Sequence, residues 1–291
     1  LPDSLEIAEP AMFADDTNLT VTGETSAEIQ NKLEGEIQNV LKWLRTNKLT
    51  LNEKKTEYML IGSAKRLKQI QNDLIIKIND HVIKRVYNKN VLGLEIDDKL
   101  KWTGHVEKQS KKISCSIAML RNIKPYVPQS TLQMMYKSFL LPYFNYCSTI
   151  WHDGNKLHAE KLLKLQKRAA RVITSSGYDK RSSEIFQMLN WTKIQSILKK
   201  RELMITFKSL KGMAPEYMTQ MFSVSENQIY QLRRNHQKLY LRKPKTNFLK
   251  RSFSYRAAAS WNQLLMEKLP LTKLPETSIG SFKRLIENLC V

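Results

Sequence analysis

The sequence lacks the features that mark several common classes of protein. Its three cysteines are widely spaced and form no Cys-x-x-Cys pair, which argues against a disulfide framework and a zinc site. Nine glycines and nine prolines in 291 residues are too few for long disordered tracts. No apolar run reaches the roughly 18 residues of a membrane-spanning helix, and no secretory signal opens the sequence. The five histidines have no Cys or carboxylate at metal-binding spacing, so we expect no structural metal and interpret the pairing of His152 with His158 as a coincidence.

Acidic residues are scarce in the second part of the chain. Residues 1–100 have 14 Lys/Arg and 16 Asp/Glu, a net charge of −2, whereas residues 101–291 have 34 and 11, a net charge of +23. Such an asymmetry indicates a polyanionic partner. The basic residues are spread over many predicted helices and are not gathered on one amphipathic anchor. We therefore expect the polyanionic partner to be a nucleic acid and not a membrane surface.

Two adjacent carboxylates, Asp15 and Asp16, follow a short apolar segment at residues 11–14. Residues 17–21 are typical of a returning strand, so the pattern predicts a hairpin with paired aspartates at its tip. Paired carboxylates can hold the two metal ions, about 3.5–4 Å apart, that stabilise an in-line phosphoryl transfer. Mg²⁺ suits that role because it prefers carboxylate and phosphate oxygens. The alternative is ordinary turn chemistry, since Asp bonds its own backbone in turns.

Hydrophobic periodicity predicts an α+β first part and an all-α second part. Thr25 and Glu28 have capping-box spacing, and an apolar stripe then predicts a helix that ends near Asn47. We expect a small antiparallel sheet beside this one helix. Its further strands are predicted at 57–61, 74–78, 82–87 and 91–96. Later helices are predicted at 106–121, 157–173, 194–210, 257–265 and 281–290, with one more from Ser130 to Pro142.

These segments, in their order, resemble the reverse transcriptases of non-LTR (LINE-type) retrotransposons, in the jockey/CR1-like group. Phe13–Thr17 resembles the catalytic box, and Trp43–Thr56, with Asn52 and Lys55 at polar positions, resembles the next palm motif. The remaining likeness is carried by a primer-grip-like segment (Leu92–His105), a thumb motif (Leu165–Arg171) and two segments near the end (Tyr255–Asn262 and Ser281–Arg284).

The resemblance implies a fold and an activity. Residues 1–103 would be the carboxyl-terminal part of a polymerase palm, residues 104–225 a helical thumb and residues 226–291 a basic carboxyl-terminal region. Such an enzyme is an RNA-directed DNA polymerase, which extends a DNA primer on an RNA template with Mg²⁺ by two-metal nucleotidyl transfer. It must reach chromosomal DNA, so the resemblance implies a nuclear location, although no targeting signal is visible.

The resemblance also implies functional residues. Asp15 would be a direct metal ligand, Asp16 the supporting carboxylate, and Lys55 the acid that protonates the pyrophosphate leaving group. The primer backbone would be held by Leu92 and Gly93. A row of basic residues would follow the phosphates of an RNA–DNA hybrid without reading its sequence, namely Lys161, Lys164, Lys167, Arg168 and Arg171. Each role has a structural alternative. Lys55 could be an ordinary solvated lysine, Gly93 an ordinary strand glycine, and the row of basic residues a solvated helix face.

One departure from the family pattern limits these expectations. The family's metal site needs a third carboxylate from an earlier strand, and the enzyme needs a fingers region, but only 14 residues precede Asp15. We therefore expect the chain to be a fragment of the polymerase that is inactive alone. The alternative is a non-catalytic, basic nucleic-acid-binding remnant or domesticated protein.

Overall fold

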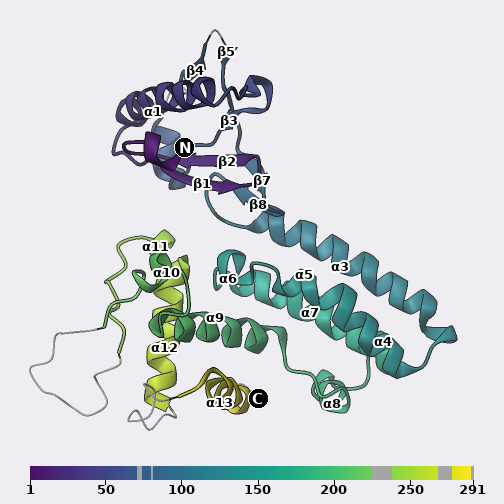
Figure 1. Ribbon diagram of the computed structural model, residues 1–291. Helices are drawn as coiled ribbons and strands as arrows, with labels where there is room; N and C mark the ends of the chain where they lie inside the picture. The colour runs from purple at the N-terminus through teal and green to yellow at the C-terminus, as the bar shows by residue number, and fades with distance from the viewer. Residues whose placement is uncertain (71–73, 80, 225–237, 268–276, 290–291) are drawn as a thin grey trace, which may run out of the picture. The chain divides into compact units, whose positions relative to one another are not determined.

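The computed structural model describes residues 1–70, 74–79, 81–224, 238–267 and 277–289 (Figure 1). The chain separates into two compact units, Leu1–Leu100 and Lys101–Val291. The second unit includes both of the ranges that the resemblance assigns to a thumb and to a separate carboxyl-terminal region. Each unit is described by itself below.

The first unit consists of short paired strands and two α-helices. Its four ladders are β1–β2, β4–β5 and β7–β8, all antiparallel, and β3–β6, which is parallel. The expected single antiparallel sheet is therefore wrong for the described residues, where each ladder has two strands. The strands are β1 Glu9–Phe13, β2 Asp16–Thr20, β3 Glu57–Tyr58, β4 Lys77–Ile78, β5 His81–Val82, β6 Lys84–Arg85, β7 Asn88–Val91 and β8 Leu94–Asp97. The helices are α1 Ser26–Thr46 and α2 Ala64–Gln69, with 3-10 turns η1 Pro2–Ser4 and η2 Glu53–Lys55.

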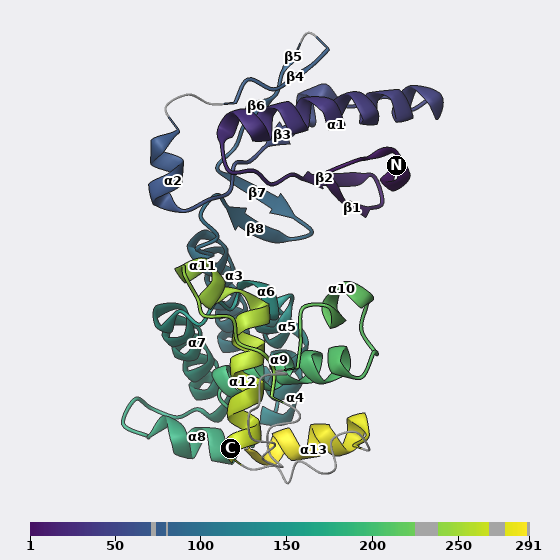
Figure 2. The ribbon, with the colours of Figure 1, turned by 90° about the vertical axis from the view of Figure 1, so that its left-hand side faces the viewer.

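Helix α1 confirms the helix predicted from the capping box. The Thr25 side chain accepts a hydrogen bond from the Glu28 N–H, and the Glu28 carboxylate accepts one from the Glu24 N–H at 2.9 Å. The helix ends at its C-cap residue, Asn47. Its apolar stripe packs in one core cluster with residues from the later strands and loops, in which the buried members are Ile37, Leu41, Leu60, Leu74, Ile76, Ile78 and Ile83. In both views α1 lies between the β1–β2 and β4–β5 hairpins (Figures 1 and 2).

A buried carboxylate on α1 holds the segment that leads into β1. Glu36 is 2% exposed. Its Oε1 accepts backbone hydrogen bonds from the N–H groups of Glu6, Ile7 and Ala8, at 3.0, 2.6 and 3.3 Å. These bonds satisfy three consecutive backbone donors and also the buried charge, which is otherwise costly. Glu36 therefore sets the position of the chain just before the hairpin that carries Asp15 and Asp16.

The described elements of the second unit are helices, apart from one isolated antiparallel bridge between Val224 and Leu239. Helices α3 and α7 lie side by side, and α9 packs against α7, α12 and α13 (Figures 1 and 2). The predicted helix at 194–210 is confirmed as α9, with Gly212 (φ 65°) just after it, and the predicted 157–173 helix as α7. The elements are α3 Thr103–Ile123, η3 Lys124–Tyr126, α4 Gln129–Met135, a π-helical turn Tyr136–Leu140, α5 Leu141–Asn145, α6 Ser148–Trp151, α7 Lys156–Thr174, α8 Ser182–Met188, α9 Ile194–Leu210, α10 Glu216–Thr219, α11 Asn247–Arg251, α12 Phe253–Glu267 and α13 Ile279–Leu289.

The predicted helix from Ser130 to Pro142 is wrong at both ends. Helix α4 begins at Gln129, after Pro128, and Ser130 makes no cap. The helical path continues through the π-helical turn and past Pro142 to Asn145. Pro142 lies in the first turn of α5, directly after the π-helical turn, the position of a helix that best accepts proline.

The last helices pack into the same core as α9. The ring of Phe282 on α13 stacks on Phe207 of α9 at 4.2 Å between centroids, and Trp261 on α12 lies 5.8 Å from Phe282. The Asn262 side chain also clamps the backbone of Leu239, accepting from its N–H and donating to its C=O, both at 2.8 Å. Leu239, Trp261 and Phe282 thus belong to the same helical core as α9. Among the described helices, none has both the length and the apolar character needed to cross a membrane.

Candidate functional site

The two aspartates lie at the tip of the β1–β2 hairpin. Phe13 pairs with Asp16, so Ala14 and Asp15 form a two-residue loop, with Ala14 at a positive φ of 53°. Asp15 is therefore a turn residue, while Asp16 begins the returning strand. Both carboxylates are exposed to solvent. The ring of Phe13 is also 64% exposed, so the described residues of the first unit leave it largely uncovered.

The aspartates fit Mg²⁺ only as part of a ligand set. In the described ranges, no group of three or more His, Cys, Asp or Glu side chains could hold a metal ion. Asp15 and Asp16 are adjacent and open to water, and Mg²⁺ accepts one or two carboxylates when water or phosphate oxygens complete its octahedron. The metal-binding role of Asp15 and Asp16 stays a prediction.

Lys55 ends the 3-10 turn η2, which Asn52 caps. The Asn52 side chain accepts a hydrogen bond from the Lys55 N–H at 3.2 Å, and the Lys55 side chain is exposed. In the described part of the chain, no ion pair or hydrogen bond joins Lys55 to Asp15 or Asp16. The structure therefore leaves the proposed proton donor and the aspartates on separate elements, and the role of Lys55 stays a prediction.

Leu92 and Gly93 form a hairpin turn, so the predicted strand at 91–96 is wrong at these two residues and confirmed at residues 94–96, in β8. Val91 pairs with Leu94, and the two residues between them have φ values of 48° and 81°. Positive φ at both central residues is typical of the type I′ turn, which follows the twist of the paired strands and which Gly adopts at no steric cost. Gly93 is thus a turn glycine and not an ordinary strand glycine. Its contact with a primer backbone stays a prediction.

Helix α7 has one buried face and one basic face. At 100° per residue, the five predicted phosphate-binding residues fall within an arc of about 120°. Lys161, Lys164 and Arg168 are exposed, and Lys167 and Arg171 are half-buried. The opposite face is buried against the rest of the unit through His158, Leu162, Leu165, Gln166, Ala169, Ala170, Val172 and Ile173. The structure thus brings all five predicted basic residues to one side of one helix.

The five basic side chains differ in their contacts. Lys161 Nζ lies 3.9 Å from Glu107 Oε1 on α3, and both side chains are largely exposed, so this ion pair contributes little. Within the described residues, Lys164, Lys167 and Arg168 make no ion pair and no side-chain hydrogen bond. Their charges are therefore free to contact an anion.

Arg171 instead holds the loop that follows α7. Its Nε donates to Gly177 O and its Nη2 to Lys180 O, both at 3.3 Å. Its guanidinium also lies 5.4 Å from the centroid of the Tyr178 ring. The prediction of a simple phosphate contact missed this second role of Arg171.

The interior of the Leu165–Arg171 segment fixes α7 to the start of α9. The Gln166 amide donates to Thr192 O at 2.9 Å and accepts from the Ile194 N–H at 2.8 Å. Ala169 and Ala170 are fully buried, which lets neighbouring elements approach closely. This segment of the resemblance therefore combines a structural face with a charged outer face.

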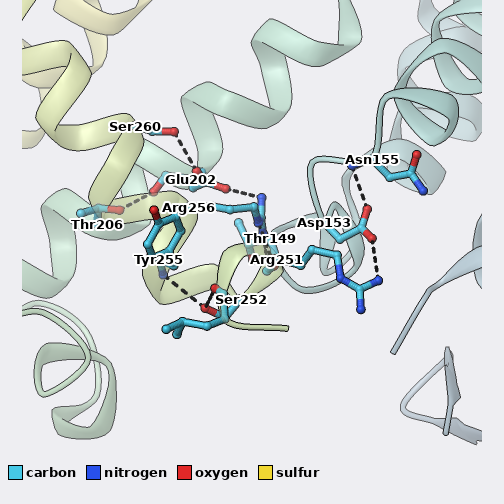
Figure 3. Close-up of polar contacts among 11 residues, drawn as sticks. Thr149, Asp153, Asn155, Glu202, Thr206, Arg251, Ser252, Tyr255, Arg256 and Ser260 are labelled. Atoms are coloured by element: carbon cyan, nitrogen blue, oxygen red, sulfur yellow. Dashed lines mark hydrogen bonds and ion pairs between the residues drawn. The ribbon is translucent and has the colours of Figure 1, made fainter. Parts of the chain in front are cut away.

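A buried ion pair that the sequence did not reveal joins α9 to α12 (Figure 3). Arg256 Nη1 donates to Glu202 Oε2 at 2.6 Å, and Ser260 donates to Oε1 at 3.1 Å. Arg256 also donates to the carbonyls of Thr149 and Arg251, at 2.9 and 3.0 Å. Burial raises the pKa of Glu202 and lowers the pKa of Arg256, while the attraction between them opposes both shifts. The partners lie on α6, α9, α11 and α12, so this cluster ties four helices together.

A second buried carboxylate, Asp153, lies beside this ion pair (Figure 3). Asp153 is 4% exposed and accepts from the Asn155 N–H at 3.1 Å. His158 Nδ1 and Arg251 Nη1 each lie 3.6 Å from its oxygens. Burial favours a higher pKa for Asp153, but the contacts with His158, Asn155 and Arg251 outweigh it and lower the pKa.

Two histidines, His158 and His152, lie near the charges of this cluster. Burial, together with the nearby positive charge of Arg256, lowers the pKa of His152 to about 4. The charge of His158 also contributes to that shift. The interpretation of their spacing as a coincidence, and not as a pair of metal ligands, stays a prediction.

Comparison with known proteins relates the chain to retrotransposon proteins. It is 23% identical over 166 residues to the Retrovirus-related Pol polyprotein from type-1 retrotransposable element R1 3 of Nasonia vitripennis, which covers 56% of this chain and 43% of that protein. It is 20% identical over 149 residues to the corresponding R1 2 polyprotein of the same organism, covering 48% and 35%. The chain thus spans less than half the length of the curated relatives it matches. Neither a protein-family model nor a solved structure matches it.

Proposed function

We propose that the chain is a palm–thumb part of a non-LTR retrotransposon reverse transcriptase, of the jockey/CR1-like group, and that its own activity is to hold nucleic acid along α7. The relation to R1 Pol polyproteins supports this origin. The observation that carries the binding proposal is the basic face of α7, where Lys164, Lys167 and Arg168 have no partner among the described residues. The net charge of +23 over residues 101–291 extends the same attraction over the whole helical part.

The bound partner is an RNA template paired with a DNA primer, or the RNA–DNA hybrid that they form. Contacts from lysine and arginine to phosphates release counterions, so binding weakens steeply with salt and does not depend on base sequence. In this proposal Leu92 and Gly93, at the tip of the β7–β8 hairpin, contact the primer backbone. The place of action is the nucleus, where the chromosomal target lies.

In the whole polymerase, Asp15 and Asp16 are metal ligands. Bound Mg²⁺ there supplies electrostatic stabilisation of nucleotidyl transfer. The residues of this chain bind and orient: the Glu36 carboxylate fixes the entry to the hairpin, and the tip presents both aspartates to solvent. Lys55 supplies a proton to the departing pyrophosphate.

We expect the chain to show no primer extension by itself, because two exposed carboxylates leave most of the metal's coordination to water. The assay adds a primed RNA template, Mg²⁺ and deoxynucleoside triphosphates to the purified protein. Incorporation that Asp15→Asn abolishes would contradict the proposal of an inactive part.

A second candidate function is binding alone, by a remnant or a domesticated protein. The open carboxylate pair, with no third acidic ligand among the described residues, favours it. It predicts hybrid binding that ignores both Mg²⁺ and Asp15→Asn. Binding that needs both would exclude it.

The binding proposal itself is tested by charge reversal on α7. The variant Lys164→Glu/Arg168→Glu changes two exposed residues, and we expect its affinity for a short RNA–DNA hybrid to fall by tenfold or more, about the effect of losing two phosphate contacts at moderate salt. The matched control is Lys65→Glu/Arg66→Glu on α2, which makes the same change in net charge on two exposed residues of the first unit. Equal losses in both variants, measured by fluorescence anisotropy, would show that α7 is not the binding surface.

A further inference from the structure

The loop that follows α7 presents an aromatic ring at the end of the basic face. Tyr178 is 85% exposed, although hydrogen bonds hold the loop that carries it. Two residues, Ser175 and Ser176, turn the chain out of the helix: Ser175 adopts the left-handed conformation, and the Ser176 N–H donates to Arg171 O at 3.2 Å. Ser176 Oγ also lies 2.8 Å from Thr174 Oγ1.

Arg171 fixes this loop on both sides of the ring. Its guanidinium donates to the carbonyls of Gly177 and Lys180, which flank Tyr178 and Asp179 in the sequence. The same guanidinium lies 5.4 Å from the ring centroid, the arrangement of a cation–π contact. The ring is therefore held in place by Arg171 and is still open to solvent over most of its surface. A ring held in this way loses little conformational entropy when a ligand stacks on it.

The contact with Arg171 also places the ring at the C-terminal end of the phosphate-binding face. Arg171 lies within the same arc of α7 as Lys164, Lys167 and Arg168, and it is the last basic residue of the helix. From Lys161 to Arg171 the helix rises about 15 Å, which corresponds to roughly four base steps of a duplex at ~3.4 Å each. A strand that follows these charges therefore reaches Tyr178 after a short stretch of duplex.

We infer that Tyr178 stacks on an unpaired nucleobase at the end of the duplex held by α7, so that the site recognises a junction between duplex and single strand. The inference rests on the proposed function, since the duplex must lie along α7. Aromatic rings beside basic residues bind single strands because every base has a π-face, and such stacking tolerates any sequence. The α7 charges hold the phosphates, and the ring selects the position where pairing stops.

The test compares two probes that differ only in their ends: a blunt RNA–DNA hybrid, and the same hybrid with a short single-stranded extension. Binding of the full chain is measured by fluorescence anisotropy. We expect tighter binding of the extended probe, and we expect Tyr178→Ala to remove that preference, a loss of about 5- to 150-fold for one stacked base. Tyr178→Phe keeps the ring and should keep the preference. Because the side chain is so exposed, the circular dichroism of both variants should match that of the wild type.

A second readout reports the stacking itself. A fluorescent base analogue at the first unpaired position should be quenched by the wild type and by Tyr178→Phe, but not by Tyr178→Ala. Arg171→Lys keeps the charge but loses the fork that holds both carbonyls, so it should weaken the quenching.

The outcomes separate this inference from the proposal on which it rests. No preference for the extended probe in the wild type, or an unchanged preference in Tyr178→Ala, overturns the junction site while α7 binding stands. An equal loss for both probes in Tyr178→Ala also overturns it, because the ring would then act on the duplex alone. If neither probe shows binding that weakens with salt, the proposed function itself is overturned.

Discussion

Acidification should weaken the helical unit through His152, by an amount that follows from its surroundings. Burial and the neighbouring Arg256 lower the pKa of His152 from 6.5 to about 4, with Asp153 acting in the opposite direction. The unfolded chain therefore takes up a proton near pH 6.5, and the folded chain does so only near pH 4. A histidine that is kept neutral by folding contributes stability above pH 6.5, and this contribution is lost as the pH falls. Between pH 7 and pH 5 the loss in the free energy of unfolding is about 2 kcal/mol.

The assay is urea unfolding at pH 7 and pH 5, followed by tryptophan fluorescence, for the wild type and for His152→Gln. Other groups also titrate: the raised pKa of Glu202 gives a contribution of the opposite sign, which is lost as the pH rises, and the lowered pKa of Asp153 acts only at more acidic pH. The contributions of Glu202 and Asp153 are the same in the wild type and in His152→Gln, so they cancel when the two proteins are compared. The variant should lose about 2 kcal/mol less than the wild type between the two pH values. An equal loss in both proteins would refute the account of His152.

Two further predictions concern the buried carboxylates. Arg256→Met leaves Glu202 buried without its cation, and we expect it to lower the free energy of unfolding by about 3–5 kcal/mol. The double variant Glu202→Gln/Arg256→Met should recover much of this loss, because it also removes the buried charge. If urea unfolding shows no recovery, the role given to the ion pair is wrong. Glu36→Ala removes the acceptor of three backbone N–H groups, so it should lower the free energy of unfolding by about 2–3 kcal/mol. It should also speed hydrogen exchange at the Ile7 and Ala8 amides. Unchanged exchange there would contradict the role given to Glu36.

Elements with strong local signals could be predicted from the sequence. The capping box and apolar stripe located α1, and helical periodicity located α7 and α9. The basic face of α7 followed from the same periodicity. Local signals failed at Leu92, because leucine is a poor indicator of positive φ and the hairpin turn was therefore read as part of a strand. The same local signals also did not show that the strands form separate two-stranded ladders and not one sheet.

The buried charge cluster could not be predicted, because its members are distant in the sequence. Arg256 is 54 residues from Glu202 and 107 from Thr149, so only the tertiary packing brings them together. The resemblance to the family at Tyr255–Asn262 indicated this segment, but it did not explain what the segment does. The structure supplies one, since Arg256 and Asn262 both hold the helical core. Similarly, the resemblance indicated Arg171 as a phosphate contact, and the loop that it anchors depends on side-chain geometry.

The most direct test of the central claim is the salt dependence of hybrid binding. The logarithm of the binding constant is plotted against the logarithm of the salt concentration for the wild type, Lys164→Glu/Arg168→Glu and Lys65→Glu/Arg66→Glu. If α7 follows the phosphates, the wild type has a steep negative slope, and the α7 variant has a slope shallower by about 1.8, the value for two lost contacts on a duplex. The control variant keeps the wild-type slope. A slope that is flat in the wild type, or the same in both variants, would contradict the assignment of α7 as the nucleic-acid-binding surface.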